Sequence, residues 1–274
     1  MAGSHASRVM AFRLLLEYDG TRFQGWQGQG TARGFRTVSD MLARAVEKSG
    51  FSVVQIVGAG RTDSGVHALG QVAHLHLDTL GAAPPIDLQR MLTRTLPSDL
   101  VVRSAVCCDP RFHARHHAVS RSYLYQLALR PSALAHHFAW TPDEPPDPSI
   151  LANAWRQFEG FIDVSSFAII PSKKDPRVEV QRCDSLQCGA VVLLRVTASH
   201  FLPRMVRRVV GACVRCAQGL ADMDRLIHDI RTPSREAGLE WGRYPAPPHG
   251  LFLEHVQYPG EADPGPLQPI VRVE

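Results

Sequence analysis

The chain has 274 residues, of which 45% are apolar and 20% charged, and its formal net charge is +4 with histidine neutral. This composition excludes a disordered or fibrous protein and favours about two domains with a sizeable core. No apolar run reaches the ~18 residues that span a bilayer, and no secretory signal is recognised. The six cysteines are irregularly spaced, which is typical of reduced thiols. We therefore expect a cytoplasmic protein.

Arginine supplies almost all of the positive charge, with 27 arginines against three lysines. The planar guanidinium group of arginine can form two parallel hydrogen bonds with a phosphate and can stack on nucleobases, so this bias fits a nucleic-acid partner. A GC-rich coding sequence would also enrich arginine whatever the function. The placement of the arginines has to decide between the two explanations.

The first half alternates predicted strands and helices. Residues 1–9 show no periodicity and are expected to be a disordered start or an artificial extension. Thr37 has the character of a helix N-cap, and apolar residues then repeat at helical spacing as far as Gly50. The predicted order is β-α-β-β-α-β, the ferredoxin-like arrangement. Its elements are strand 12–18, helix 38–49, buried strand 52–58, strand 71–78, helix 86–96 and strand 100–106.

The second half repeats a similar pattern, so we interpret the chain as an elaborated duplication of one α+β unit. Its predicted elements are strand 123–129, helix 150–158, hairpin strands 178–186 and 190–198, helices 203–218 and 222–230, and strand 250–256, with 161–170 ambiguous. The expected boundaries are 10–110 for the N-terminal half with the aspartate loop, 111–258 for the C-terminal half, and 259–274 for an unstructured tail.

A short glycine-flanked loop, GAGRTDSG at 58–65, separates two predicted strands. It places a base, Arg61, and an acid, Asp63, two residues apart on a rigid scaffold, which suits a catalytic site. The alternative is a surface turn in which Asp63 only caps the backbone.

The helix predicted from Pro203 combines an apolar face with several arginines. Arg204, Arg208 and Arg215 fall near one stripe and Arg207 lies beside it, which favours phosphate binding, although an ordinary solvated helix face is also charged. Gly211 in mid-helix costs ~1 kcal/mol relative to alanine, so we expect another backbone segment to approach it closely.

A third candidate site is the stretch RFHARHHAVSRSYLY at 111–125. Its bases and aromatic rings are the groups that looped RNA requires, phosphate partners and stacking surfaces. The candidate phosphate contacts are Arg111, Arg115 and Arg121. Tyr123 and Tyr125 share one strand face, so at least one of them is expected in the core.

Metal and nucleotide-cofactor sites have little support. Cys213 and Cys216 show C-x-x-C spacing, but inside a predicted helix and without a second pair. The histidine pairs, such as His74 with His76, have no carboxylate in a recognisable catalytic pattern. No P-loop, dinucleotide or nucleophile-elbow motif occurs, so we predict no metal and no cofactor.

The stretch AGRTDSGVHALGQVAHL at 59–75 resembles the signature of the tRNA pseudouridine synthase A (TruA) family. Five further segments resemble the family in the same order, so the resemblance extends from Phe12 to about Tyr258. These segments are YDGTRFQGWQGQ at 18–29, RTVSDML at 36–42, FHARHHAVSRSYLY at 112–125, FLPRMVRRVVG at 201–211 and APPHGLFL at 246–253.

The resemblance implies a cofactor-free cytoplasmic isomerase that converts uridine to pseudouridine at positions 38–40 of the tRNA anticodon stem-loop. It implies the α+β pseudouridine synthase fold, with two ferredoxin-like halves forming an extended mixed or antiparallel sheet, an active-site cleft between the halves, and a homodimer. Asp63 matches the catalytic aspartate, Arg61 the residue that displaces the target base, Tyr123 the tyrosine that packs on uracil, and Arg207 the basic partner of the aspartate.

Three alternatives to this function stay open, and one of them is a metal-dependent hydrolase that would use the histidines. The chain could modify uridines at other RNA sites, in accord with departures from the family pattern at Thr93, Thr95 and Ile162. A non-catalytic RNA-binding protein would have no need for Asp63 in a glycine-flanked loop, and the chain lacks the aromatic motif of an RNA-recognition module.

Overall fold

The computed structural model describes residues 9–27, 36–79, 87–172 and 174–273. Residues 1–8 of the expected disordered start, part of the loop after Trp26 and the predicted helix start at Ile86 lie outside the described residues. The protein is of the α+β class, with a large, mostly antiparallel sheet. The chain divides into a first unit, Met1–Val119 with Leu253–Glu261, and a second unit, Ser120–Phe252 with Ala262–Glu274.

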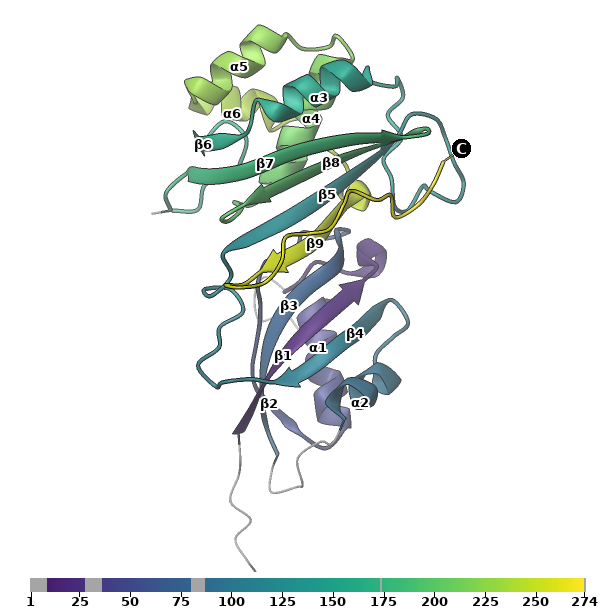
Figure 1. The fold of residues 1–274 in the computed structure, drawn as a ribbon, viewed down its shortest axis with the longest axis vertical. Helices are drawn as coiled ribbons and strands as arrows, with labels where there is room; N and C mark the ends of the chain where they lie inside the picture. The colour runs from purple at the N-terminus through teal and green to yellow at the C-terminus, as the bar shows by residue number, and fades with distance from the viewer. Residues whose placement is uncertain (1–8, 28–35, 80–86, 173, 274) are drawn as a thin grey trace, which may run out of the picture. The chain divides into compact units, whose positions relative to one another are not determined.

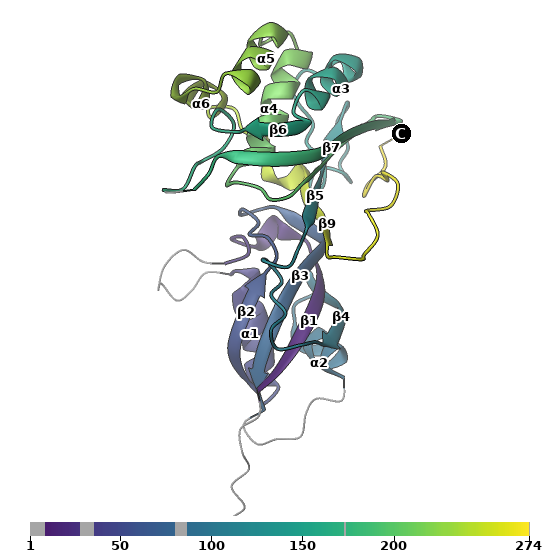
Figure 2. The same cartoon turned by 60° about the vertical axis from the view of Figure 1, so that its left-hand side comes forward.

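In the first unit, two helices accompany an antiparallel sheet in the strand order β4-β1-β3, with β2 also pairing β3 (Figure 2). The strand β9 (Leu251–Gln257) lies mostly in this unit. The elements in chain order are β1 (Val9–Tyr18), the 3-10 turn η1 (Gly20–Arg22), α1 (Val38–Lys48), β2 (Ser52–Gly58), β3 (His67–Asp78), α2 (Leu88–Thr95) and β4 (Leu100–Cys107).

Local chemistry accounts for the start of α1. Thr37 is the N-cap of α1, where its hydroxyl accepts a hydrogen bond from the backbone N–H of Asp40 at 3.3 Å, as predicted. The strand β2 is found where expected, but the prediction that it is buried is wrong, because Val54 is 55% exposed. An apolar run indicates a strand but does not show how much of it neighbouring elements cover.

In the second unit the sheet order is β5-β8-β7-β6, with helices α3 and α4 packed against each other (Figure 1). The short strand β6 resolves the ambiguous part of the sequence around 161–170. The elements are β5 (Ser120–Ala128), α3 (Pro148–Arg156), β6 (Gly160–Asp163), β7 (Arg177–Cys188), β8 (Val191–Ala198), α4 (Met205–Ala217), α5 (Met223–Arg231), α6 (Arg235–Trp241) and the 3-10 turn η2 (Pro248–Gly250).

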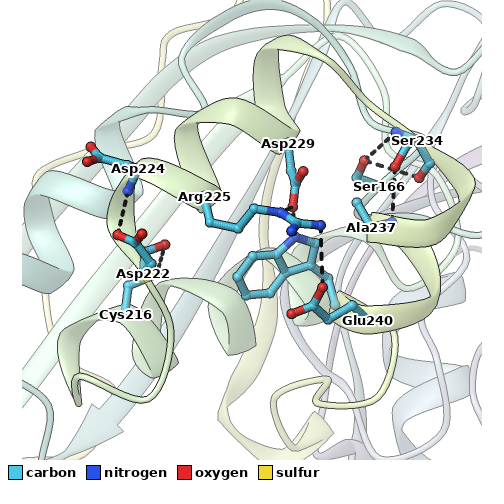
Figure 3. A network of polar contacts seen from close by, with 10 residues as sticks. Ser166, Cys216, Asp222, Asp224, Arg225, Asp229, Ser234, Ala237 and Glu240 are labelled. Atoms are coloured by element: carbon cyan, nitrogen blue, oxygen red, sulfur yellow. Dashed lines mark hydrogen bonds and ion pairs between the residues drawn. The ribbon is translucent and has the colours of Figure 1, made fainter.

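The helix α6 was not predicted from the sequence, and a polar network centred on the buried Asp229 joins it to α5 (Figure 3). The carboxylate of Asp229 accepts hydrogen bonds from Arg225 Nε at 2.7 Å and from Trp241 Nε1 at 2.9 Å. At the start of the helix the Ser234 hydroxyl accepts from the N–H of Ala237 at 3.1 Å. A seven-residue helix is too short to be stable alone, so these contacts and the buried Trp241 ring hold it in place.

The C-terminal segment 262–273 contains no helix or strand, but it packs on the second unit. The N–H of Ile270 donates to Gln126 Oε1 at 2.7 Å, and Arg195 Nη1 donates to the carbonyl of Gly265 at 2.9 Å. Specific hydrogen bonds therefore fix a segment that its proline- and glycine-rich composition would leave irregular. Of the helices in the described ranges, none is long and apolar enough to cross a membrane.

Candidate active site

The loop between β2 and β3 is held by hydrogen bonds from three directions. The Gln71 side chain brackets Gly60, donating through Nε2 to its carbonyl at 2.8 Å and accepting from its N–H through Oε1 at 3.3 Å. The Tyr18 hydroxyl lies 2.9 Å from the hydroxyl of Thr62, and the Thr62 carbonyl accepts from the N–H of Trp26 at 3.1 Å. Burial raises the pKa of Tyr18 to about 12, so its hydroxyl stays protonated.

Close backbone contacts require glycine at two positions around this loop. A Cβ on Gly25, whose φ is +84°, would lie 2.6 Å from the Thr62 carbonyl oxygen. A Cβ on Gly20 would lie 2.0 Å from the carbonyl oxygen of Val66. Real Cβ atoms do not approach oxygen so closely, so the segment 20–25 can lie against the loop only because it lacks these side chains.

The two candidate groups flank the anchored residue. Thr62 is buried, Arg61 is exposed and Asp63 is half-buried. Because Thr62 is fixed on both its side chain and its carbonyl, the directions of Arg61 and Asp63 are determined by the scaffold. The sequence identified the two charged residues but missed the anchors Tyr18, Thr62 and Gln71; the only signal for Thr62 was its position between two candidate catalytic residues.

The other two candidate catalytic residues belong to the second unit. Tyr123 lies on β5 and is 7% exposed, and its ring meets that of Phe201 edge-on at 4.9 Å between centroids. Tyr125 on the same strand is fully buried, which confirms that at least one of the two tyrosines is a core residue.

Arg207 lies in the first half of α4 and bonds twice with one residue of the segment that precedes β9. Its Nε donates to the carbonyl of Ala246 at 2.8 Å, and its own carbonyl accepts from the N–H of Ala246 at 2.8 Å. Gly211 lies one turn further along, and a Cβ there would be 1.9 Å from the carbonyl oxygen of Tyr244. The predicted close approach of a backbone to Gly211 is therefore confirmed.

The stretch 111–118 lies on the first unit's sheet and is fixed there by buried groups. The N–H of Ala114 donates to His74 Nδ1 at 3.0 Å, and its carbonyl accepts from the Tyr258 hydroxyl at 2.7 Å. Burial and the nearby His113 lower the pKa of His74 to about 4, so its ring is neutral near pH 7 and able to accept this bond. Arg13 lies over the Tyr258 ring at 4.4 Å and pairs with Glu261 at 2.6 Å.

Three of the candidate RNA-binding arginines are exposed. Arg111 and Arg115 extend from the stretch 111–118, where Arg111 pairs with Asp109 at 2.9 Å. Arg204 precedes α4 with φ +61° and ψ +3°, the one non-glycine residue with positive φ among those described. A left-handed backbone is costly for a residue with a Cβ, so the fold holds Arg204 in a strained conformation.

The other three candidate arginines use their guanidinium groups within the second unit. Arg121 is 7% exposed and donates to the carbonyl of Ser199 at 2.9 Å. Arg208 donates to the carbonyl of Ala168 at 2.9 Å, and burial, with a smaller effect from Arg204, lowers its pKa. Arg215 lies over the ring of Tyr244 at 3.9 Å. These contacts hold segments of the second unit together.

The cysteines and histidines were the candidate metal ligands in the sequence. No three His, Cys, Asp or Glu side chains there gather in a way that could hold a metal ion. All six cysteines are free thiols, and burial raises the pKa of Cys213 well above its usual value. Cys213 and Cys216 are both buried on α4.

The sequence matches the profile of a protein family described as tRNA pseudouridine synthase over residues 15–116 and 154–259. It is 33% identical over 250 residues to a tRNA pseudouridine synthase A of Chlamydia trachomatis, covering 90% of this chain and 91% of the relative. A tRNA pseudouridine synthase A of Pseudomonas aeruginosa is 32% identical, and the match covers 95% of this chain and 90% of the relative. Another protein of that name, from Thermosynechococcus vestitus, is 36% identical, and the match covers 90% of this chain and 85% of the relative. Since the matched regions include both units and the loop with Asp63, the chain belongs to the tRNA pseudouridine synthase family.

Proposed function

We propose that this protein isomerises uridine to pseudouridine in tRNA, with Asp63 as the essential catalytic group. The observation that carries the proposal is the loop 58–66, which presents Asp63 and Arg61 on either side of the anchored Thr62. Because their directions are fixed, Asp63 and Arg61 can act on a bound uridine without any reorganisation of the loop.

The reaction breaks the bond between the sugar C1′ and uracil N1 and forms a bond from C1′ to C5. The product has the same atoms as the substrate, because the hydrogen lost from C5 is balanced by one gained at N1. No oxidant, reductant or cofactor is therefore needed. In the proposal, the carboxylate of Asp63 acts at the sugar or the base while the uracil is detached and turned.

The remaining roles follow from charge and shape. In the proposal, Arg207 is the basic partner that pairs with the carboxylate of Asp63. A uridine in a stem is stacked and must leave the helix, at a cost of a few kcal/mol, before any group can reach its C1′. The exposed Arg61 occupies the vacated space, and the ring of Tyr123 packs on the uracil. These roles require the two units, each related to a ferredoxin-like arrangement, to form one cleft around the uridine.

Binding of the tRNA is assigned chiefly to the exposed arginines. Arg111, Arg115 and Arg204 contact backbone phosphates, so affinity falls as salt rises. Arg121, Arg208 and Arg215 also belong to the proposed RNA-binding set, but their guanidinium groups already bond within the second unit, so we expect a smaller contribution from them. We further propose the uridines at positions 38–40 as targets, a homodimer as the active form, and the cytoplasm as the location.

The decisive experiment maps pseudouridine in tRNA incubated with the purified protein and with its Asp63→Asn variant. We expect Asp63→Asn to abolish the product while tRNA binding stays within about threefold, because the substitution keeps the size of the side chain. The matched control is Asp175→Asn, an exposed aspartate paired with Arg177, which should retain full activity. Product formation by Asp63→Asn would refute the catalytic assignment.

The same assay separates the alternatives. A tRNA with cytidine at positions 38–40 should yield no pseudouridine, and product elsewhere in that tRNA would favour a synthase that acts on other sites. Binding without product by the wild-type protein would favour the non-catalytic RNA-binding alternative.

A further inference from the structure

The segment 244–250 of the second unit connects α6 to β9 and contains two consecutive carbonyl groups that accept side-chain hydrogen bonds. Arg207 Nε on α4 donates to Ala246 O at 2.8 Å, and the hydroxyl of Tyr125 on β5 donates to Pro247 O at 2.9 Å. The backbone N–H of Ala246 in turn donates to Arg207 O at 2.8 Å. The position of this segment therefore depends on α4 at one residue and on β5 at the next.

The ring of Tyr125 is fixed by its packing. The side chain is fully buried, and a Cβ on Gly250 would lie 2.7 Å from the ring carbon that bears the hydroxyl. Trp140 meets the ring edge-on at 6.3 Å between centroids. Burial raises the pKa of Tyr125 well above its usual value, so the hydroxyl is a permanent donor to Pro247.

Arg207 depends on this segment for its direction. A guanidinium group is planar, so fixing Nε on the Ala246 carbonyl also sets the direction in which its two terminal nitrogens point. The positive charge of Arg207 also acts on the phenol of Tyr125, where it opposes the effect of burial on the pKa. The two side chains are therefore coupled through adjacent carbonyl groups and through the electrostatic field.

We propose that Tyr125 is a positioning residue for Arg207, acting through the segment 244–250. The inference rests on the proposed function, in which Arg207 pairs with Asp63. Without the Tyr125 hydroxyl, Pro247 O loses its partner, the segment relaxes, and the plane of the Arg207 guanidinium is no longer set for that pairing. A displacement of about 1 Å at a catalytic group costs up to 100-fold in rate.

The test is a double-mutant cycle with Tyr125→Phe and Arg207→Lys, in which kcat and KM for pseudouridine formation are measured separately. We expect Tyr125→Phe to lower kcat about tenfold and to leave KM within twofold. Arg207→Lys should lower kcat more strongly, since lysine has no planar fork to orient. In the Arg207→Lys background, Tyr125→Phe should change kcat by less than about twofold, because the group it positions is absent.

Thr197→Val is the matched control for the loss of a buried hydroxyl. Thr197 lies on β8 and its hydroxyl is 2.8 Å from that of Ser122 on β5, so this buried contact joins two strands of the same unit. We expect it to lower the melting temperature about as much as Tyr125→Phe does, with kcat unchanged.

Four outcomes would overturn the inference, and each has a different meaning. An equal effect of Tyr125→Phe in both backgrounds would show that Tyr125 does not act through Arg207. An equal loss of kcat in Thr197→Val would show a general effect of lost stability. Wild-type kcat in Arg207→Lys would remove the role of Arg207 that the inference needs, while the proposed function would stand. No pseudouridine from the wild-type protein would refute the proposed function itself and the inference with it.

Discussion

The contact at Gly211 predicts that Gly211→Ala destabilises the protein, the reverse of what this substitution does in most helices. In an ordinary helix interior the change stabilises by ~1 kcal/mol, because alanine has the higher helix propensity. Here the added Cβ would lie 1.9 Å from the carbonyl oxygen of Tyr244, whereas ordinary contact begins at 3.4 Å. The helix α4 and the segment around Tyr244 therefore have to separate by about 1.5 Å.

Such a separation would also break the pair of hydrogen bonds between Arg207 and Ala246. Both bonds are 2.8 Å long and would be stretched beyond hydrogen-bonding distance, at about 1 kcal/mol each. Overpacking of this kind costs ~1–3 kcal/mol where the neighbours relax only in part. After the gain in helix propensity, we expect a net loss of about 2–4 kcal/mol in the free energy of unfolding.

Urea denaturation followed by circular dichroism measures this loss directly. The matched control is Gly238→Ala in α6, where the new Cβ would lie 3.0 Å from the carbonyl oxygen of Ser165 and a shift of a few tenths of an ångström suffices. We expect the control to change stability by less than ~1 kcal/mol. A Gly211→Ala variant as stable as the wild type would refute the argument that this backbone contact requires glycine.

Two further predictions concern the strained arginine and the buried histidine. Arg204→Gly should be about 1 kcal/mol more stable than Arg204→Ala, because only glycine relieves the strain of the left-handed backbone. Both variants should weaken tRNA binding equally and flatten its salt dependence. Equal stability of the two variants would contradict the strain at Arg204. His74 is neutral when folded, with its pKa lowered to about 4, so its contribution to stability is complete above pH 6.5 and is lost as the pH falls from 6.5 to 4. In His74→Asn, which keeps an acceptor for the N–H of Ala114, urea midpoints should fall less over this pH range; an unchanged pH dependence would exclude His74 as its source.

The sequence predicted most elements because their signals are local. Thr37 predicted the start of α1, where it is the N-cap. Gly211 in an apolar helix predicted the close approach of another backbone segment, which the structure confirms. The helix α6 was missed because its seven residues include only two buried apolar side chains, Ala237 and Trp241. Its one local signal was Ser234, which caps the first turn.

The parts that could not be predicted depend on contacts between distant segments. The alternation in β3 places His74 on the face opposite the apolar residues, yet that histidine is 1% exposed because Ala114 and its neighbours cover it. At the candidate site, the motif with Arg61 and Asp63 was visible in the sequence. The contribution of Tyr18 to the same loop was not, because it comes from a hydroxyl 44 residues away from Thr62.

The first unit is completed by Leu253–Glu261, residues that the ribosome adds about 130 positions after Val119. Until they emerge, Arg13 lacks both the ring of Tyr258 and the carboxylate of Glu261, and Ala114 lacks the Tyr258 hydroxyl. Domains usually fold in order of synthesis, but this one has to wait for the second unit to be translated. A chain that stops before Leu253 therefore leaves the stretch 111–118, with the proposed phosphate contacts Arg111 and Arg115, without these bonds.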